Sequence, residues 1–215
     1  MHATSRSLRP RRPGLRTLAA ALALAFAPPI LANDAEVVSL VGKGEAREAG
    51  ASDWRPALVR QKLRGGAFVR TGDSSTMALL MQDQTQLRLN QNSMLQIKET
   101  AANAPTRLEL KGGRAWMNSK GKAGSVVIDT PNATAAIRGT QWELEVDPAG
   151  KTLLAVFSGT VEFSNAQGSV SVGRNEAALA ESGKAPVKIA LTNPGDRVQW
   201  VNAYAVDPRR YAEAA

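Results

Sequence analysis

Short runs of alternating apolar and polar residues fill this sequence from Glu36 to Glu181, separated by Gly, Asp, Asn or Pro. Successive side chains of a β-strand point to opposite faces of the sheet, so each run predicts a short strand with one buried face. Strands at intervals of about 8–12 residues are typical of an all-β sandwich, barrel or roll. Trp54–Leu63 fits either a strand or a short helix. The predicted strands are Val37–Val41, Ala67–Thr71, Thr76–Met81, Thr85–Leu89, Met94–Lys98, Arg107–Lys111, Arg114–Asn118, Ser125–Asp129, Ala133–Ile137, Thr140–Val146, Thr152–Phe157, Thr160–Phe163, Ser169–Val172 and Ala177–Ala180.

The segment from Thr140 to Phe157 predicts a β-hairpin. Its first strand places Trp142, Leu144 and Val146 on one face, with glutamine and glutamate side chains on the other. The turn Asp147–Gly150 has a proline that presets φ and a glycine that tolerates positive φ. We expect Trp142 to pack in the core, because it shares a face with two aliphatic residues.

The end of the chain changes character and predicts one short helix. Asn193 can cap the helix, Pro194 suits its first turn, and Pro208 ends it. Trp200 and Tyr204 are four residues apart, so they share one face of this helix. A short helix with one apolar face is expected to pack on the β body.

The first 32 residues have the composition of a secretory signal peptide. Five arginines and no acidic residue precede an apolar run, Leu18–Ala27, and Pro28 and Pro29 follow it. A run of this length is shorter than the roughly 20 residues that span a bilayer. We expect cleavage after Ala32 and a periplasmic mature protein that does not span the membrane. A leader retained as an anchor is the alternative.

The net charge of +8 depends largely on that leader. Without residues 1–32, 22 of the 27 basic side chains remain against 19 acidic ones, and the net charge falls to +3. A nucleic-acid-binding surface needs a concentrated excess of positive charge, and this remainder does not have one. We therefore expect no nucleic-acid partner.

Two absences restrict the chemistry that the mature chain can perform. The sequence has no Cys, and its only histidine is His2, within the predicted leader. Cysteine nucleophiles, Ser-His-Asp catalysis and ordinary zinc sites are thereby excluded from the mature chain. Calcium binding lacks a loop of spaced oxygen ligands. We expect no metal and no cofactor.

Several motifs resemble those of the FecR domain, and they extend over roughly Val37 to Glu181. The most specific is a Thr-Pro pair followed by Arg-Gly-Thr seven residues after the proline. At Gln84 the sequence departs from the family, which usually has Gly there. The matching segments are Val69-Arg70-Thr71-Gly72-Asp73-Ser74-Ser75, Met77–Leu80, Leu87–Leu89, Leu108–Gly113, Asp129-Thr130-Pro131, Ile137-Arg138-Gly139-Thr140-Gln141-Trp142 through Val146, and Ser158-Gly159-Thr160 through Phe163.

The resemblance implies an extracytoplasmic all-β domain, a twisted solenoid-like roll of short strands. In the members that gave the family its name, this domain follows a cytoplasmic anti-sigma segment and a transmembrane helix. It relays signals from an iron-siderophore transporter. Here the FecR-like part begins soon after the predicted leader, so we do not expect the whole iron-signalling role. The expected organisation is a signal peptide at 1–32, a FecR-like domain at 33–181 and an extension with a short helix at 182–215.

The motif residues have structural and functional interpretations. Arg138 could bind a carboxylate or phosphate of a ligand, but we expect its donors to bind nearby carbonyls beside the bend at Gly139. Arg138→Ala is therefore expected to harm folding more than binding. The structural reading is also favoured for the other motif residues. The family motif comprises Gly72, Asp73 (whose carboxylate should cap neighbouring amides), Thr130, Pro131, Arg138, Gly139, Thr140, Trp142 and Gly159.

Tryptophans and paired glutamates are the other candidate site residues. Exposed tryptophans can stack on sugars, and Trp116 is the best candidate for an exposed, binding aromatic residue because the alternation around it is ambiguous. Glu143 and Glu145 on one strand face would be about 6.5–7 Å apart, a separation that an acid/base pair could use. A solvated polar strand face has the same pattern.

Three classes of function remain open. The first is an exported, non-catalytic module that binds a partner protein or small ligand of the cell envelope, in sensing, signalling or scaffolding. The second is a cell-wall glycan-binding module, and the third is a carboxylate-dependent glycan hydrolase. The sequence favours the first, and with it the absence of enzymatic activity.

Overall fold

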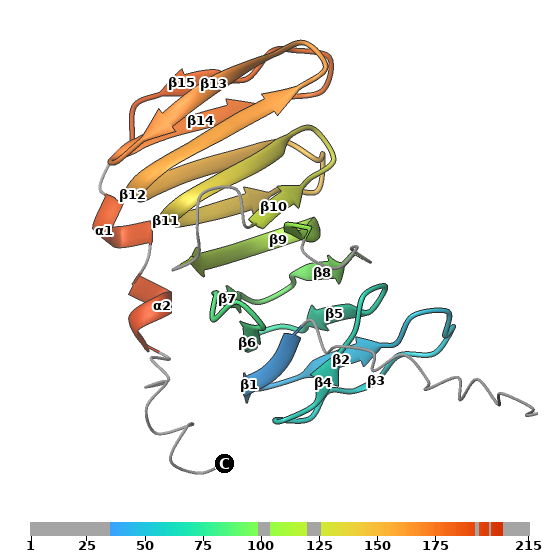
Figure 1. Ribbon diagram of the computed structural model, residues 1–215. Coiled ribbons are helices and arrows are strands. Elements are labelled where there is room, and N and C mark those ends of the chain that lie inside the picture. Colours follow the sequence, from blue (N-terminus) through green and yellow to red (C-terminus); the bar gives the residue numbers. More distant parts are fainter. Residues whose placement is uncertain (1–34, 99–103, 120–125, 192–193, 198, 204–215) are drawn as a thin grey trace, which may run out of the picture. The chain divides into compact units, whose positions relative to one another are not determined.

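The computed structural model describes residues 35–98, 104–119, 126–191, 194–197 and 199–203 (Figure 1). The predicted leader and its cleavage site lie outside these residues. The all-β prediction is confirmed, with short helices only near the C-terminus. No helix in the described part of the chain has the length and hydropathy of a membrane span.

The fifteen strands found in the described residues join one hydrogen-bonded network. The main path runs in the order β15-β14-β12-β11-β10-β9-β7-β6-β1-β4, and the other strands branch from it. The strands are β1 (Ala35–Val41), β2 (Gly44–Arg47), β3 (Arg55–Pro56), β4 (Lys62–Leu63), β5 (Phe68–Thr71), β6 (Thr76–Met81), β7 (Gln86–Leu89), β8 (Met94–Ile97), β9 (Thr106–Asn118), β10 (Val126–Asp129), β11 (Thr134–Val146), β12 (Thr152–Asn165), β13 (Gly168–Gly173), β14 (Glu176–Ala180) and β15 (Val187–Ile189).

Three long strands replace pairs of predicted short ones. β9, β11 and β12 each continue through a glycine at which the sequence predicted a break. Gly113, Gly139 and Gly159 take positive φ there, so each strand bends without ending. At the bend of β11, Arg138 and Gln141 pair with Thr160 and Ser158, so two residues of β11 oppose the single Gly159. This arrangement is a β-bulge.

The core is one continuous apolar cluster, and its strands keep the predicted alternation. Val37, Leu79, Leu87, Met117 and Trp142 are directly opposite one another on successive strands, and all are at most 1% exposed. Because opposite residues of paired strands share a face, this row marks the core side of the sheet.

The Trp54–Leu63 segment, whose structure the sequence left undecided, contains the two-residue strands β3 and β4. The expected C-terminal helix is found as two short helices, α1 (Pro194–Arg197) and α2 (Gln199–Ala203). They lie beside the sheet (Figure 1), and hydrogen bonds join them to β7 and β11, so the expected packing on the β body is confirmed. The predicted ends at Asn193 and Pro208, and the side chain of Tyr204, lie outside the described residues.

Candidate functional site

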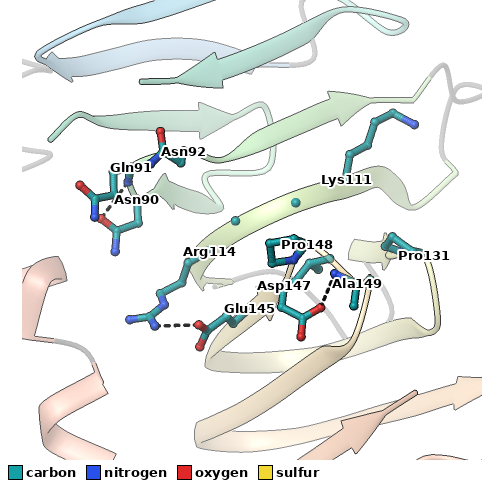
Figure 2. Close-up of a pocket in the computed structure, with 14 residues that line it drawn as sticks. Asn90, Gln91, Asn92, Lys111, Arg114, Pro131, Glu145, Asp147, Pro148 and Ala149 are labelled. Atoms are coloured by element: carbon teal, nitrogen blue, oxygen red, sulfur yellow. Dashed lines mark hydrogen bonds and ion pairs between the residues drawn. The ribbon is translucent and has the colours of Figure 1, made fainter. Parts of the chain in front are cut away.

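A polar groove of about 850 Å³ lies where β9 changes partners (Figure 2). On one side of β9, pairing with β10 ends at Glu109 and pairing with β11 begins at Gly113. Turns occupy the interval between these two partners. The groove is lined by Asn90, Gln91, Asn92, Lys111, Gly112, Gly113, Arg114, Pro131, Glu145, Val146, Asp147, Pro148, Ala149 and Gly150.

One wall is the turn between β7 and β8, and residues at the turn between β5 and β6 hold it. Asp73 accepts a hydrogen bond of 2.9 Å from the Asn92 amide, and the Gln91 side chain accepts one of 3.0 Å from the Ser74 backbone N–H. Thr71 donates to the Asn90 carbonyl at 2.5 Å. The residues of the Thr-Gly-Asp motif therefore position this wall.

The opposite wall consists of two turns that are tied together. Asp147 Oδ1 accepts hydrogen bonds of 2.9 Å from the backbone N–H groups of Ala149 and Lys151, and Gly150 has a φ of 82°, as the hairpin prediction requires. Asn132, which follows the Thr-Pro pair, donates to the Gly150 carbonyl at 2.7 Å. The turn of the Thr-Pro motif thus supports the hairpin turn.

The two glycines in the floor of the groove have different structural roles. Gly113 has a φ of 87°, and a Cβ there would lie 2.5 Å from the Ser93 Cα and 2.6 Å from the Asn92 carbonyl oxygen, so the fold requires glycine. A Cβ at Gly112 would meet nothing within 4 Å. The fold therefore does not require glycine at position 112. A side chain there would project into the groove, so the glycine keeps this part of the groove open.

The two basic side chains of the groove are paired with glutamates, and the Asp147 carboxylate is bonded to backbone N–H groups. Arg114 Nη2 lies 3.0 Å from Glu145 Oε1, as Figure 2 shows, and Lys111 Nζ lies 2.7 Å from Glu109 Oε1. Most other polar groups are amides and main-chain atoms. The arrangement suits hydrogen bonding to a polar or peptide ligand better than capture of a strongly charged ion.

A second polar cluster lies on the outer face of the sheet. Ala78, Arg88, Trp116 and Glu143 are directly opposite one another on β6, β7, β9 and β11, and we call these four residues the outer row. Each is at most 8% exposed, although they lie on the side opposite the core row. α1 and α2 supply contacts that cover this face, and we call residues 194–203 the C-terminal segment.

The C-terminal segment binds the outer row through charged and polar groups. Arg197 donates to Glu143 Oε1 from Nε at 3.0 Å and to Glu145 Oε2 from Nη2 at 2.6 Å, and the Trp200 indole N–H donates to Glu143 Oε2 at 3.0 Å. Arg88, whose guanidinium carbon is 5.6 Å from the centre of the Trp116 ring, donates to the Val201 carbonyl. Contacts with β7 and β11 therefore anchor this segment.

The two glutamates of this cluster have pKa values shifted in opposite directions. Burial raises the pKa of Glu143 above its ordinary value, against the opposing effects of Trp200, Arg114 and Arg197. Burial acts in the same direction on Glu145, but hydrogen bonds from Arg114 and Arg197 outweigh it and lower the pKa of Glu145. The Glu143 side chain has no exposed surface and is inaccessible to a substrate, whereas the Glu145 side chain is 35% exposed and ion-paired with Arg114 and Arg197.

The structure overturns the expectation that Trp116 is exposed. Its exposed fraction is 8%, because Arg88 lies over the ring and the face that carries Trp116 is covered. The Trp54 ring, in turn, has guanidinium carbons of Arg70 and Arg47 at 4.2 and 5.0 Å from its centre. The tryptophan faces that stacking on a sugar would need are therefore occupied at these positions.

The remaining motif residues lie at bends and turns. Trp142 is fully buried, as expected, and neither its indole N–H nor the buried Thr140 hydroxyl has a hydrogen-bond partner within the described part of the chain. The Asp73 carboxylate binds the side-chain amide of Asn92, whereas we expected it to cap neighbouring amides. Thr130 closes its turn by hydrogen bonds with the main chain of Ala133. The side chain of Arg138 lies outside the described parts of the structure, so its role stays a prediction.

Sequence reasoning missed the groove wall formed by residues 90–92 and the two arginines, Arg114 and Arg197, that bind the glutamates. Asn90, Asn92 and Arg197 follow no alternating pattern, and Arg114 was assigned only to a strand. The Asn-Gln-Asn run between two strands was the available signal, because such clusters mark turns. Among the described residues, no group of three His, Cys, Asp or Glu side chains could hold a metal ion.

The fold defines a class of protein, a small all-β domain in which long strands bend at glycines and turns enclose a polar groove. Residues 67–162 match the family described as FecR protein. The resemblance to FecR domains seen in the sequence motifs is thus confirmed over these residues. The matched range is narrower than the motif-bearing range of Val37 to Glu181.

Two crystal structures of a candidate anti-sigma factor from Parabacteroides distasonis ATCC 8503, at 1.65 and 2.50 Å, are similar in fold. Each superposes with a TM-score of 0.54 and 14% sequence identity, which shows a shared fold. The similar region covers 62% of this chain and 64% or 63% of the other chain, so it spans less than two thirds of that protein. No curated protein matches this sequence.

Proposed function

We propose that this protein is an exported sensing or signalling module of the cell envelope, that it binds a partner protein in the polar groove, and that it catalyses no reaction. The observation that carries the proposal is the position of the groove. Every residue that lines it falls within residues 67–162, the range that matches the FecR family. The structural neighbours described as candidate anti-sigma factors support a signalling role for this type of domain.

The chemistry of the groove favours a peptide segment as its ligand. Gly112 leaves the β9 backbone open where a side chain would otherwise project. Glycine in a strand often marks a place where another backbone approaches closely. Asn90, Gln91 and Asn92 offer amide groups along one wall, and such groups can donate to and accept from a peptide main chain.

A role without catalysis is supported by the residues that the chain possesses. The sequence has no Cys, and its only histidine lies in the predicted leader. The carboxylates that could form an acid/base pair, Glu143 and Glu145, are both hydrogen-bonded to Arg197. A general acid or base must reach the proton that it transfers. Both carboxylates instead accept hydrogen bonds from a side chain of the protein itself.

Export is proposed from the sequence of residues 1–32, with their arginines and short apolar run. N-terminal sequencing of the protein recovered from the periplasmic fraction tests it. We expect a mature chain that begins at or near Asn33. A chain that keeps Met1 and sediments with membranes would contradict this part of the proposal.

Site-specific photo-crosslinking of the full chain in living cells tests partner binding. A photoreactive amino acid at Gln91 should yield a defined crosslinked protein, because Gln91 lines the groove. The same group at Ser171, an exposed position of β13 outside the groove, should not. Gly112→Leu should abolish the crosslink at Gln91, since its side chain would fill open space in the groove without meeting other atoms at Cβ.

Ser171→Leu is the matched control, because it adds a leucine to an exposed strand away from the groove. It should leave the crosslink at Gln91 unchanged. If Gly112→Leu folds normally and the crosslinked product persists, the groove is not the partner-binding surface. Turnover of envelope glycans by the purified protein would contradict the absence of catalysis.

A further inference from the structure

We propose that the outer row is itself a docking site, whose ligand is a short helical segment carrying an arginine and, three residues later, a tryptophan. In this structure the chain's own C-terminal segment occupies the site with Arg197 and Trp200. A segment of another protein with the same two side chains would bind by displacing it. This inference concerns the outer row and not the groove, although Glu145, which binds Arg197, also lines the groove.

The first support is the burial of polar groups on a sheet face that would otherwise be exposed to solvent. Arg88 and Glu143 are 8% and 1% exposed, yet they alternate with core residues and point away from the core. Lys and Glu residues normally occupy such faces because water solvates them. Here α1 and α2 cover the face. The polar groups of the outer row therefore depend on a bound segment, and not on water, for their hydrogen bonds.

The second support is the specificity that Glu143 imposes on any occupant. Its carboxylate is surrounded by Arg197, by the Trp200 indole N–H and, at 4.0 Å, by Arg114. A buried carboxylate that loses its donors is strongly unfavourable, so a replacement segment has to bring a cation and an N–H donor. The guanidinium fork of arginine can bond to Glu143 and Glu145 at once, which an ammonium group does less well.

The third support is that the described contacts of the C-terminal segment include several polar ones. Two short helices of four and five residues cannot be stable alone, so their structure depends on docking. Of their described side chains only Val201 is buried and apolar, at 5% exposed, while the anchors are Arg197, Trp200 and the Val201 carbonyl. Contacts of this kind can open without disrupting the core row.

The chain's own segment would then set the affinity for a competitor. A site that is vacant only part of the time binds an added ligand more weakly, in proportion to the vacant fraction. Because the segment is tethered, its effective concentration is high and the vacant fraction is small. Weakening the segment's own anchors should therefore strengthen binding of the same sequence supplied separately.

The test uses the full mature chain and a fluorescent synthetic peptide with the sequence of residues 190–205. Anisotropy titrations compare the wild-type chain with the double variant Arg197→Gln, Trp200→Phe, which loses one cation and one N–H donor. We expect the peptide to bind the double variant at least tenfold more tightly than the wild-type chain. A control peptide with the same two substitutions should bind neither protein.

Equal binding of the peptide to both proteins, or binding to neither, would overturn the proposal. Binding that coincides with dimer formation in sedimentation experiments would also overturn it, because the ligand would then be the segment of a second copy. If the double variant does not fold, hydrogen exchange on the wild-type chain decides. We expect the α2 amides to exchange at least 100-fold faster than those of β11, since local opening precedes global unfolding. Equal protection of the two elements would mean that the segment opens only with the whole domain, which contradicts the proposal.

Discussion

The indole N–H of Trp200 donates a 3.0 Å hydrogen bond to the carboxylate of Glu143, whose side chain is fully buried 57 residues earlier in the chain. Glu143 is on the outer face of β11, and Trp200 belongs to α2. This contact makes the C-terminal segment part of the folded domain, because without it a buried carboxylate loses a donor.

Trp200→Phe should lower the free energy of unfolding by about 1–3 kcal/mol, since it keeps an aromatic ring but leaves Glu143 Oε2 without its indole donor. Urea unfolding followed by circular dichroism measures the change. Trp54→Phe is the matched control, because its ring contacts Arg47 and Arg70 through the face. It should cost under about 0.5 kcal/mol, as for surface substitutions. Equal losses in the two variants would count against the role of the indole hydrogen bond.

Gly113→Ala should destabilise the protein by about 2 kcal/mol or more. Alanine is strained at the positive φ of this position, and its Cβ would clash with the backbone of Ser93. Gly112→Ala is the neighbouring control, with no positive φ and open space around its Cβ. We expect this control to be neutral or slightly stabilising. Thermal unfolding of the two variants provides the comparison. A Gly112→Ala variant as unstable as Gly113→Ala would contradict the distinction between the two glycines.

Gln84→Gly should stabilise the protein by about 0.5–1 kcal/mol. Gln84 is exposed and has a φ of 65°, in the turn where the FecR family usually has glycine. Left-handed backbone costs a residue with a Cβ, and removal of the side chain relieves that cost. The gain is partly offset because glycine has more freedom in the unfolded chain. A lower midpoint of urea unfolding for Gln84→Gly would show that its side chain stabilises the turn.

Acid should destabilise the domain partly through Asp129. Burial would raise the pKa of Asp129, but hydrogen bonds from Arg107 and Thr134 and the charge of Arg107 outweigh it and lower the pKa. A carboxyl whose pKa is lower in the folded state stabilises above its ordinary value, near 4, and loses that contribution as the pH falls through the folded value.

Asp129→Asn should therefore cost about 0.5–1 kcal/mol at pH 7, a modest figure because Arg107 is half exposed, and should make the loss of stability below pH 4 less steep. Urea unfolding from pH 7 to pH 3 measures both effects. A variant whose stability falls as steeply with acid as that of the wild type would show that Asp129 does not contribute to the acid sensitivity.

The sequence predicted most strands because each has one buried face and turn residues beside it. The strands it missed or divided show the limit of that signal. β2 (Gly44–Arg47) has no large apolar side chain, and β15 (Val187–Ile189) has only three residues, so neither shows a clear alternation. β9, β11 and β12 were each divided at a glycine, because glycine marks turns more often than bends within a strand. Only pairing with a neighbouring strand on both sides of the glycine distinguishes the two cases.

The candidate site was only partly predictable, for a related reason. The alternation placed Glu143 opposite the core side of β11, and the motif placed Thr130 and Pro131 in a turn. That Asn90, Gly112 and Asp147 line one groove depends on pairing between distant strands. No local pattern specifies such pairing.

The sequence by itself determined the all-β class, the core face of the strands, the hairpin turn at Asp147–Gly150 and the resemblance to FecR domains. These follow from the two-residue period of a strand and from the backbone preferences of Gly, Pro and Asp, which are local properties. Tertiary structure alone decided that Trp116 is buried and that Glu143 is enclosed by Arg197 and Trp200. Burial depends on what covers a face, and here the cover comes from a segment more than 50 residues away in the chain.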